Sequence, residues 1–330
     1  MHKLFIYAET AFHHEGDMDF MLQLIDKTAE AGVDGIKFQV LINFDELISS
    51  SNPAYQKLQG YIFSYQQWKT IFDYSIQRQL AIVVMPLDTG SFQLTKEYKD
   101  YIRYIELHSV SYHDQLVKER IKELGIDLIL GAGGRTKKEI DEAVEYFGEQ
   151  LRVLMTGFQS YPSAIQDIRL RKIQDLRKEY PDVQVGYGDH SSYDDPWCVD
   201  SNTLAYAMGA SVFEKHITLN EGQSRVDFES AIGVEKLKKI KENLDKLYDI
   251  LFSYKDSFEM TPAEVNYRNR QKMAVANGNL KEGSIVTAKD ISLKMVGRFD
   301  GYSKLDDLVG KRLVNAIQSD TIIRPEDVSN

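Results

Sequence analysis

The chain has 330 residues, which is long for one compact core and predicts a large domain followed by a smaller one. Apolar residues make up 43% and charged residues 27%, a balance typical of soluble globular proteins. The net charge of −10 disfavours nucleic acid or an acidic membrane surface as a partner, although a local cationic pocket for an anionic substrate is compatible with it.

Cysteine content and the N-terminal segment indicate where the protein works. Cys198 is the single cysteine, so no internal disulfide can form, and we interpret it as a buried apolar side chain. Residues 1–9 lack the apolar core and small-residue cleavage site of a signal peptide. No stretch approaches the roughly 20 apolar residues of a membrane span. We therefore expect a cytoplasmic protein.

Short apolar, β-prone runs alternate with longer segments from residue 4 to about residue 252. The runs are Leu4–Glu9, Gly35–Gln39, Ala81–Pro86, Tyr101–Leu107, Asp127–Gly131, Leu151–Thr156, Val183–Asp189 and Ser211–Thr218. Eight strand–helix units in series predict parallel strands with right-handed crossovers, closed as a (β/α)₈ barrel. An open doubly wound sheet is the alternative, but the first run is not followed by the glycine-rich turn typical of that fold.

The intervening segments have the spacing of helices that bury one face. Apolar residues recur at i, i+3, i+4 and i+7 within 18–29 and again within 234–251. Thr136 with Glu139 has the pattern of a capping box, and Asp195-Pro196 resembles an N-cap followed by the first helical turn.

The character of the chain changes after the eighth unit. We predict a barrel domain over 1–252, a polar, irregular linker over 253–269, and a small domain over 270–330. Within that domain the sequence predicts a strand at Met273–Ala276 and a brief helix at Ala288–Ile291. About 60 residues provide little core, so we expect this domain to lean on a partner surface.

The ends of the predicted strands carry the residues of chemical interest, because in a parallel barrel they face the active-site mouth. These are Glu9 on strand 1, Lys37 and Gln39 on strand 2, Asp189-His190 on strand 7 and Glu214-Lys215-His216 on strand 8. Strands 7, 8 and 1 are neighbours in a closed barrel, so two histidines and acidic groups converge. Imidazole with carboxylate and water suits Mn²⁺, Zn²⁺ or Fe²⁺. The alternative is that each histidine is a hydrogen-bonded structural residue.

Two basic features could hold an anion. Lys37 lies within an apolar strand, so its ammonium either points into the polar mouth or costs several kcal/mol of desolvation. A lysine that snorkels near a strand end is the other interpretation. The segment Gly131–Arg135 follows strand 5 and could cradle an anion with backbone N–H groups, although a glycine-rich turn needs no ligand.

Several motifs together resemble the sialic acid synthases. They are Glu9 followed by His14–Asp17, then Ala31–Gln39, Tyr161-Pro162, Gly186–His190 and Glu214–His216. The segment Leu280–Thr287 is similar to the antifreeze-like (SAF) domain of that family. The resemblance extends over nearly the whole chain, and the Asp-His and Glu-Lys-His motifs are its most specific part.

The resemblance implies a condensation of phosphoenolpyruvate with an N-acylated amino sugar, such as N-acetylmannosamine, for surface polysaccharide or glycan synthesis. The products would be a nine-carbon 2-keto acid and phosphate. His190 and His216 would hold a divalent metal ion that polarises the sugar aldehyde, with Mn²⁺ expected first and Mg²⁺ or Zn²⁺ as alternatives. Glu9 would move protons and Lys37 would hold phosphoenolpyruvate. We expect the substrate-binding residues to be Gln39, Ser109, Arg135, Tyr161, Asp189, Glu214 and Asp227. The resemblance also implies a domain-swapped homodimer.

The sequence departs from the family pattern where that pattern binds phosphate. Glu106 stands at the end of strand 4 in place of a lysine that binds phosphoenolpyruvate. Met85, Gly131 and Gly188 replace hydroxyl residues after strands 3, 5 and 7. Either another cation such as Arg135 compensates, or phosphoenolpyruvate is not the substrate. The alternatives are a metal-dependent sugar aldolase or epimerase on the same scaffold, and a non-catalytic binding protein.

Overall fold

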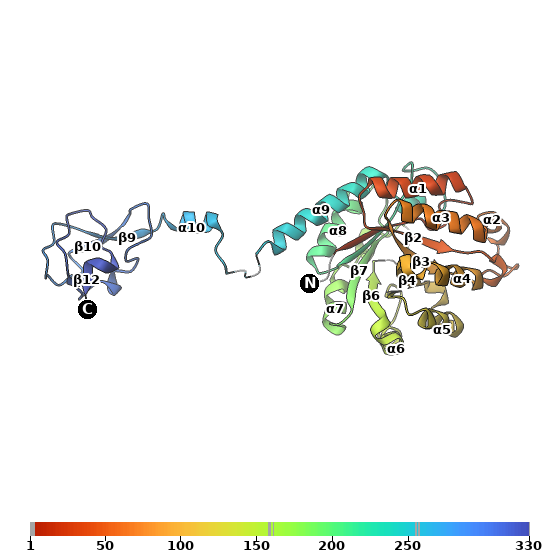
Figure 1. Cartoon of the computed structure of the whole chain (residues 1–330), viewed down its shortest axis with the longest axis horizontal. Helices are drawn as coiled ribbons and strands as arrows, with labels where there is room; N and C mark the ends of the chain where they lie inside the picture. Colours follow the sequence, from red (N-terminus) through yellow and green to blue (C-terminus); the bar gives the residue numbers. More distant parts are fainter. Residues whose placement is uncertain (1–3, 158–159, 161, 255, 257, 330) are drawn as a thin grey trace. The chain divides into compact units, whose positions relative to one another are not determined.

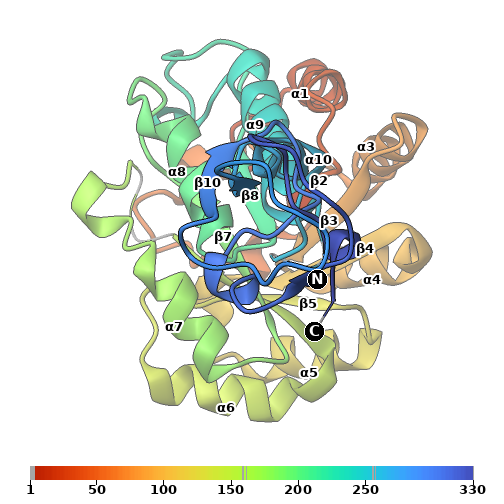
Figure 2. The ribbon, with the colours of Figure 1, turned by 90° about the vertical axis from the view of Figure 1, so that its left-hand side faces the viewer.

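The computed structural model describes residues 4–157, 160, 162–254, 256 and 258–329. The chain divides into two compact units, Met1–Leu251 and Phe252–Asn330. In the described part of the first unit, eight parallel strands close into a barrel in the order β1 to β8, and β8 pairs with β1. Helices surround these strands as an outer ring (Figures 1 and 2). The predicted (β/α)₈ barrel is confirmed.

The strands of the barrel follow the predicted apolar runs. They are β1 (Phe5–Glu9), β2 (Gly35–Val40), β3 (Ala81–Pro86), β4 (Ile102–Leu107), β5 (Leu128–Gly131), β6 (Leu151–Thr156), β7 (Gln184–Asp189) and β8 (Val212–His216). Each strand begins and ends within two residues of its prediction. Near-continuous apolar runs identified them because parallel strands are covered on both faces.

The helices of this unit pack an apolar stripe against the strands. They are α1 (Met18–Glu30), α2 (Tyr55–Gln59), α3 (Tyr65–Gln77), α4 (Thr89–Glu97), α5 (Gln115–Leu124), α6 (Lys137–Phe147), α7 (Arg171–Glu179), α8 (Trp197–Ala207) and α9 (Val234–Phe252). The predicted capping box at Thr136 and Glu139 is present. Pro196 is the N-cap of α8, one residue later than predicted, and Asp195 accepts a hydrogen bond from the backbone N–H of Trp197. Among the described residues, no helix is long and apolar enough to cross a membrane.

Side chains alternate between the barrel interior and the helix layer, as the two-residue period of a strand requires. A buried apolar cluster fills the interior below the mouth: Tyr7, Val83, Tyr104, Ile129, Val153, Met155 and Val212. The register then places Glu9 level with Lys37 on one side and with His216 on the other. The packed interior therefore forms a floor, and chemistry is confined to the strand ends above it.

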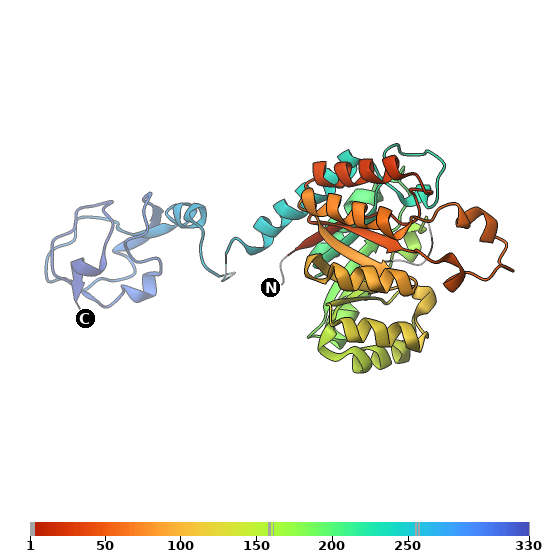
Figure 3. The same cartoon turned by 45° about the vertical axis from the view of Figure 1, so that its right-hand side comes forward.

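The connection between β2 and α3 is the long loop that carries α2, and it projects from the C-terminal side of the strands (Figure 3). An apolar cluster outside the main core packs this loop. Leu41, Phe44, Met85 and Leu87 form its buried part. Met85, at the end of β3, therefore belongs to the support of this loop as well as to the mouth of the barrel.

The second unit has a small core of its own. Its elements are α10 (Pro262–Arg268), β9 (Lys272–Ala276), β10 (Ile291–Met295), β11 (Arg312–Leu313) and β12 (Val328–Ser329). Antiparallel pairs β9–β10 and β11–β12 enclose buried Ala274, Ala276, Val286, Ile291, Leu308, Leu313, Ile317 and Ile323. This core is larger than the sequence suggested.

Two predictions for the C-terminal segments were wrong in detail. The segment expected to be an irregular linker contains α10, which begins after a capping box between Thr261 and Glu264. The helix expected at 288–291 is a turn, in which Asp290 accepts hydrogen bonds from the N–H and hydroxyl of Thr287, and Ile291 already begins β10.

Candidate active site

A cavity of about 450 Å³ opens at the C-terminal ends of the barrel strands. Eight of the predicted site residues line it: Glu9, Lys37, Gln39, Ser109, His190, Glu214, His216 and Asp227. Phe12, Leu58, Met85, Leu107, Val110 and Val226 add an apolar wall. Asp189 and Arg135 are not part of the lining, and Tyr161 lies outside the described residues.

Lys37 is the centre of a buried ionic cluster. Among the described residues, three carboxylates lie close to its Nζ: Glu9 at 3.0 Å, Glu106 at 2.8 Å and Glu214 at 2.8 Å. The Lys37 side chain is only 3% exposed. Its ammonium points into the polar mouth, as one interpretation of the sequence required, but it is already paired with protein carboxylates.

Burial and mutual charge set the protonation of this cluster. Although burial opposes the charged form, Glu106, Glu214 and Glu9 raise the pKa of Lys37 well above its usual value. Burial raises the pKa of Glu9 to about 8; Lys37 opposes this rise, and Glu214 and Glu106 add to it. Burial likewise raises the pKa of Glu106 to about 7. Glu214 behaves differently, because Lys37 and then His190 overcome burial and lower its pKa.

This charge pattern assigns different chemistry to each group. Lys37 stays a cation, so its nitrogen has no free electron pair and cannot act as a Schiff-base nucleophile. Glu9 has a pKa near the working range of a general acid or base. Its carboxylate is oriented by the backbone N–H of Ala11 at 2.9 Å and the side-chain amide of Gln39 at 3.0 Å, both of which donate to Oε1.

The two predicted metal ligands lie side by side at the mouth, at the ends of neighbouring strands β7 and β8. Nε2 of His190 lies 3.0 Å from Nε2 of His216, and both side chains are buried. Burial lowers the pKa of each imidazole, and for His216 the neighbouring His190 lowers it further. Both rings are therefore neutral near pH 7, which is the form that binds a metal ion.

The donor set fits a single divalent ion. Ligand atoms of His190, Glu214 and His216 all lie within 4.8 Å of one another. Two nitrogens 3.0 Å apart match a shared ion with metal–nitrogen distances of about 2.0–2.1 Å. The Nδ1 atom of His190 donates to the carbonyl of Gly188 at 3.0 Å, which leaves Nε2 as the coordinating atom. Two imidazoles and one carboxylate suit Mn²⁺, Fe²⁺ or Zn²⁺.

The structure does not bring Asp189 to the cavity. Gly188 and Glu214 are paired across β7 and β8 and point inward, so the next residues, Asp189 and Lys215, point toward the helix layer. Their side chains form an ion pair of 3.1 Å and are 0% and 2% exposed. Because glycine has no side chain, the inward parity of β7 was invisible in the sequence.

Arg135 is also turned away from the cavity. Its guanidinium donates to the carbonyl of Ser109 at 2.6 Å and lies over the ring of Tyr112 at 4.1 Å. Glu139 is 3.6 Å from it. The arginine thus stabilises the loop after β4 and does not supply the cation that replaces the family lysine.

Three residues of the site were not predicted as functional from the sequence. Tyr7 and His108 were not named, and Glu106 was named only as a departure from the family pattern. Tyr7 lies one inward step below Glu9 and donates to Oε2 of Glu214 at 2.8 Å. Glu106 completes the cluster around Lys37, and His108 lines the cavity beside it. Burial, with Lys37 adding to it, lowers the pKa of His108 to about 4. The two-residue parity of β1 and β4 is the signal that could have found them.

Two glycines, Gly131 and Gly188, stand where the resemblance led us to expect serines. A Cβ atom on Gly131 would meet nothing within 4 Å, and one on Gly188 would meet Oε1 of Glu214 only at 3.6 Å. Both positions would thus accept a small side chain without a clash. Gly131 lines the cavity, so the space that it leaves adds to the cavity, and neither glycine provides the hydroxyl donor of a serine.

The loop after β8 presents Asp227 to the cavity and is tied to the loop after β1. His13 bonds to the carbonyl of Val226 at 2.7 Å and to the hydroxyl of Thr218 at 2.8 Å. Arg225 lies over the ring of Phe20 at 3.7 Å. Burial, with Glu229 adding to it, raises the pKa of Asp227 to about 6.

Comparison with known proteins identifies the family to which the chain belongs. Residues 24–255 match the model of the NeuB family, and residues 271–329 match that of the SAF domain. N-acetylneuraminate-9-phosphate synthase of Homo sapiens is 24% identical over 347 residues, covering 100% of this chain and 94% of that protein. N,N'-diacetyllegionaminic acid synthase of Campylobacter jejuni is 22% identical, covering 98% and 100%.

A solved structure of the same kind aligns well with this chain. The N-acetylneuraminic acid synthetase of Leptospira borgpetersenii, crystallised with citrate, has a TM-score of 0.72 at 26% identity. The match covers 81% of this chain and 92% of that one. With a barrel of this topology and a family match over most of its length, the chain belongs to the NeuB family and carries a C-terminal SAF domain.

Proposed function

We propose that this protein is a metal-dependent synthase that joins phosphoenolpyruvate to the aldehyde of an N-acylated amino sugar, giving a sialic-acid-like 2-keto acid and phosphate. Membership of the NeuB family supports the reaction class. The observation that carries the proposal is the pair of buried imidazole nitrogens, 3.0 Å apart, beside Glu214 at the barrel mouth.

Each residue of the site would have a different role in such a condensation. A divalent ion held by His190 and His216 supplies Lewis-acid polarisation of the aldehyde oxygen. Glu9, level with His216 across β1 and β8, is placed to give or take a proton at the reacting centre. Lys37 offers the positive charge for a carboxylate, once that anion displaces part of the contact to Glu106 or Glu9. Asp227 and Gln39 provide hydrogen-bonding groups for a sugar.

One observation favours a second candidate function. Lys37 is the one ammonium that lines the cavity among the described residues, and it is surrounded by three carboxylates. This arrangement repels a phosphate. A metal-dependent sugar aldolase or epimerase without phosphoenolpyruvate would not need the missing cation. A Schiff-base aldolase is not supported, because Lys37 stays protonated.

Product analysis separates the two functions. The protein is incubated with Mn²⁺, phosphoenolpyruvate and a panel of N-acylated amino sugars, and inorganic phosphate and 2-keto acid are measured. The synthase predicts phosphate release that requires both sugar and metal and is lost in Glu9→Gln. The aldolase predicts no phosphate release but cleavage of a nine-carbon 2-keto sugar acid to pyruvate. Phosphate release without any amino sugar would contradict both functions.

A further inference from the structure

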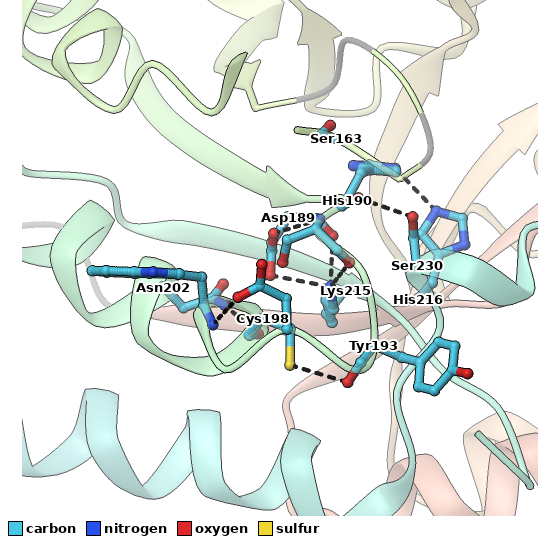
Figure 4. A network of polar contacts seen from close by, with 12 residues as sticks. Ser163, Asp189, His190, Tyr193, Cys198, Asn202, Lys215, His216 and Ser230 are labelled. Carbon is cyan, nitrogen blue, oxygen red and sulfur yellow. Dashed lines mark hydrogen bonds and ion pairs between the residues drawn. The ribbon is translucent and has the colours of Figure 1, made fainter. Parts of the chain in front are cut away.

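A buried ion pair lies directly behind the two histidines. Asp189 and Lys215 immediately precede His190 and His216, and they come from neighbouring strands β7 and β8. Figure 4 shows their side chains pointing toward each other. Neither side chain lines the cavity, and neither is more than 2% exposed. The pair thus has no direct route to a substrate.

Lys215 contacts the residues on both sides of His190. Its ammonium is 3.1 Å from Oδ2 of Asp189, and it donates to the carbonyl oxygens of Asp189 and Ser191 at 3.2 Å each. The three oxygens belong to the residues immediately before and after His190. One buried cation on β8 therefore fixes the backbone on which the β7 histidine stands.

Other groups complete the hold on this short segment. Oδ1 of Asp189 accepts from the backbone N–H of Ser191 at 2.9 Å, and Oδ2 accepts from the amide of Asn202 on α8 at 3.3 Å. The carbonyl of His190 accepts from the backbone N–H of Ser163 at 2.7 Å and from the hydroxyl of Ser230 at 2.9 Å. The turn after β7 is thus held by β8, α8 and two loops (Figure 4).

We infer that Asp189 and Lys215 are positioning residues for the metal centre, forming a clamp that keeps the His190 and His216 nitrogens at the spacing of a shared ion. Burying two charges is expensive and is often no more stable than an apolar replacement. We therefore expect the ion pair to fix the positions of the strand ends more than to stabilise the fold. Partners behind metal ligands typically contribute roughly 10–100-fold to metal affinity. The inference rests on the metal site of the proposed function.

The test uses Co²⁺ as the probe ion, because its visible spectrum reports the geometry of the ligands and its titration gives the affinity. Lys215→Met leaves a lone buried carboxylate and can fail to fold. The decisive protein is therefore the double variant Asp189→Asn/Lys215→Met, which removes both charges. Asp88→Asn is the matched control: Asp88 is also buried and, through the backbone N–H groups of Ile42 and Ser91, ties the loop after β2 to the start of α4, away from the histidines.

We expect the double variant to keep the circular dichroism of the wild type while binding Co²⁺ about 10–100-fold more weakly and with an altered visible spectrum. The control should bind Co²⁺ as the wild type does. A folded double variant with wild-type affinity and spectrum overturns the clamp and leaves the proposed function standing. Absence of Co²⁺ binding in the wild type overturns the metal site itself, and the clamp with it.

Discussion

The chemistry of the cavity is decided by single residues at the ends of five strands, β1, β2, β4, β7 and β8. Glu9, Lys37, Glu214 and His216 were predicted from the sequence because each lies at an inward position of an apolar run. An ionisable side chain at such a position costs desolvation free energy, so its presence there indicates a function. Asp189 was misplaced because glycine hid the parity of β7. The contacts of Arg135 could not be predicted, since a long side chain can turn away from the turn that carries it.

The first prediction concerns Glu106. The wild type should bind phosphoenolpyruvate weakly, and Glu106→Lys should strengthen binding by about 1–4 kcal/mol, because the change replaces an anion by a cation beside the ligand. Calorimetric titration in the presence of Mn²⁺ measures both proteins. Glu106→Gln, which removes the anion only, should lie between them. Tight binding by the wild type with no gain in the lysine variant would show that other groups hold the phosphate.

The second prediction concerns His14, which is buried and stacked on Phe63 with ring centroids 4.5 Å apart. Burial lowers its pKa to about 3, while the unfolded chain titrates near 6.5. The unfolded state therefore binds more protons between these values, so stability falls as the pH decreases below about 6.5. When the pH is lowered from 6.5 to 5, the free energy of unfolding should fall in both proteins. The fall should be about 1.5–2 kcal/mol smaller in His14→Phe than in the wild type.

Urea unfolding at several pH values measures this slope. The matched control is His113→Gln, at a side chain that is 72% exposed, and it should leave the slope as it is in the wild type. Parallel curves for the wild type and His14→Phe would mean that the buried imidazole is not the group that titrates.

At the scale of elements, the barrel was predictable because each unit repeats one pattern: an apolar strand and a helix with one apolar face. The small domain has short segments with no such repetition. Thr287 with Asp290 has the spacing of a capping box, but no helix follows it. Those bonds close a single turn, and the residues that follow pair with β9 as a strand.

The third prediction tests the packing of neighbouring strands. A Cβ atom on Gly35, at the start of β2, would lie 2.5 Å from the carbonyl oxygen of Ala81 at the start of β3. Gly35→Ala should therefore destabilise the barrel by about 1–3 kcal/mol in chemical unfolding. Gly60→Ala is the control, because its nearest contact is at 3.8 Å. Equal stability of the two variants would contradict the close approach of β2 and β3.

The chain as a whole has exposed apolar side chains where its two units join. They are Tyr248, Ile250, Leu251, Tyr254, Phe258, Met260, Val265 and Tyr267, and Phe258 is 93% exposed. Within each unit, exposed apolar side chains of this size are candidates for contact with another chain. The second unit has its own buried cluster, so the dimer can no longer be predicted from a lack of core. The exposed apolar side chains are now the reason to expect it.

The fourth prediction is that the protein is a dimer in solution. Light scattering at micromolar concentration should give about twice the mass of the chain, and Phe258→Asp should shift the equilibrium toward the monomer. Lys138→Asp, a change of charge at a side chain that is 86% exposed on α6, should not. A stable monomer for the wild type would count against the swapped arrangement that the resemblance implied.

The metal centre is the feature on which the account of this molecule depends. Element analysis of the purified protein, after incubation with Mn²⁺ and removal of free ions, tests it most directly. The wild type should retain close to one ion per chain, and His190→Ala/His216→Ala should retain none, because the two facing nitrogens are lost. Equal metal content in the two proteins would contradict the site.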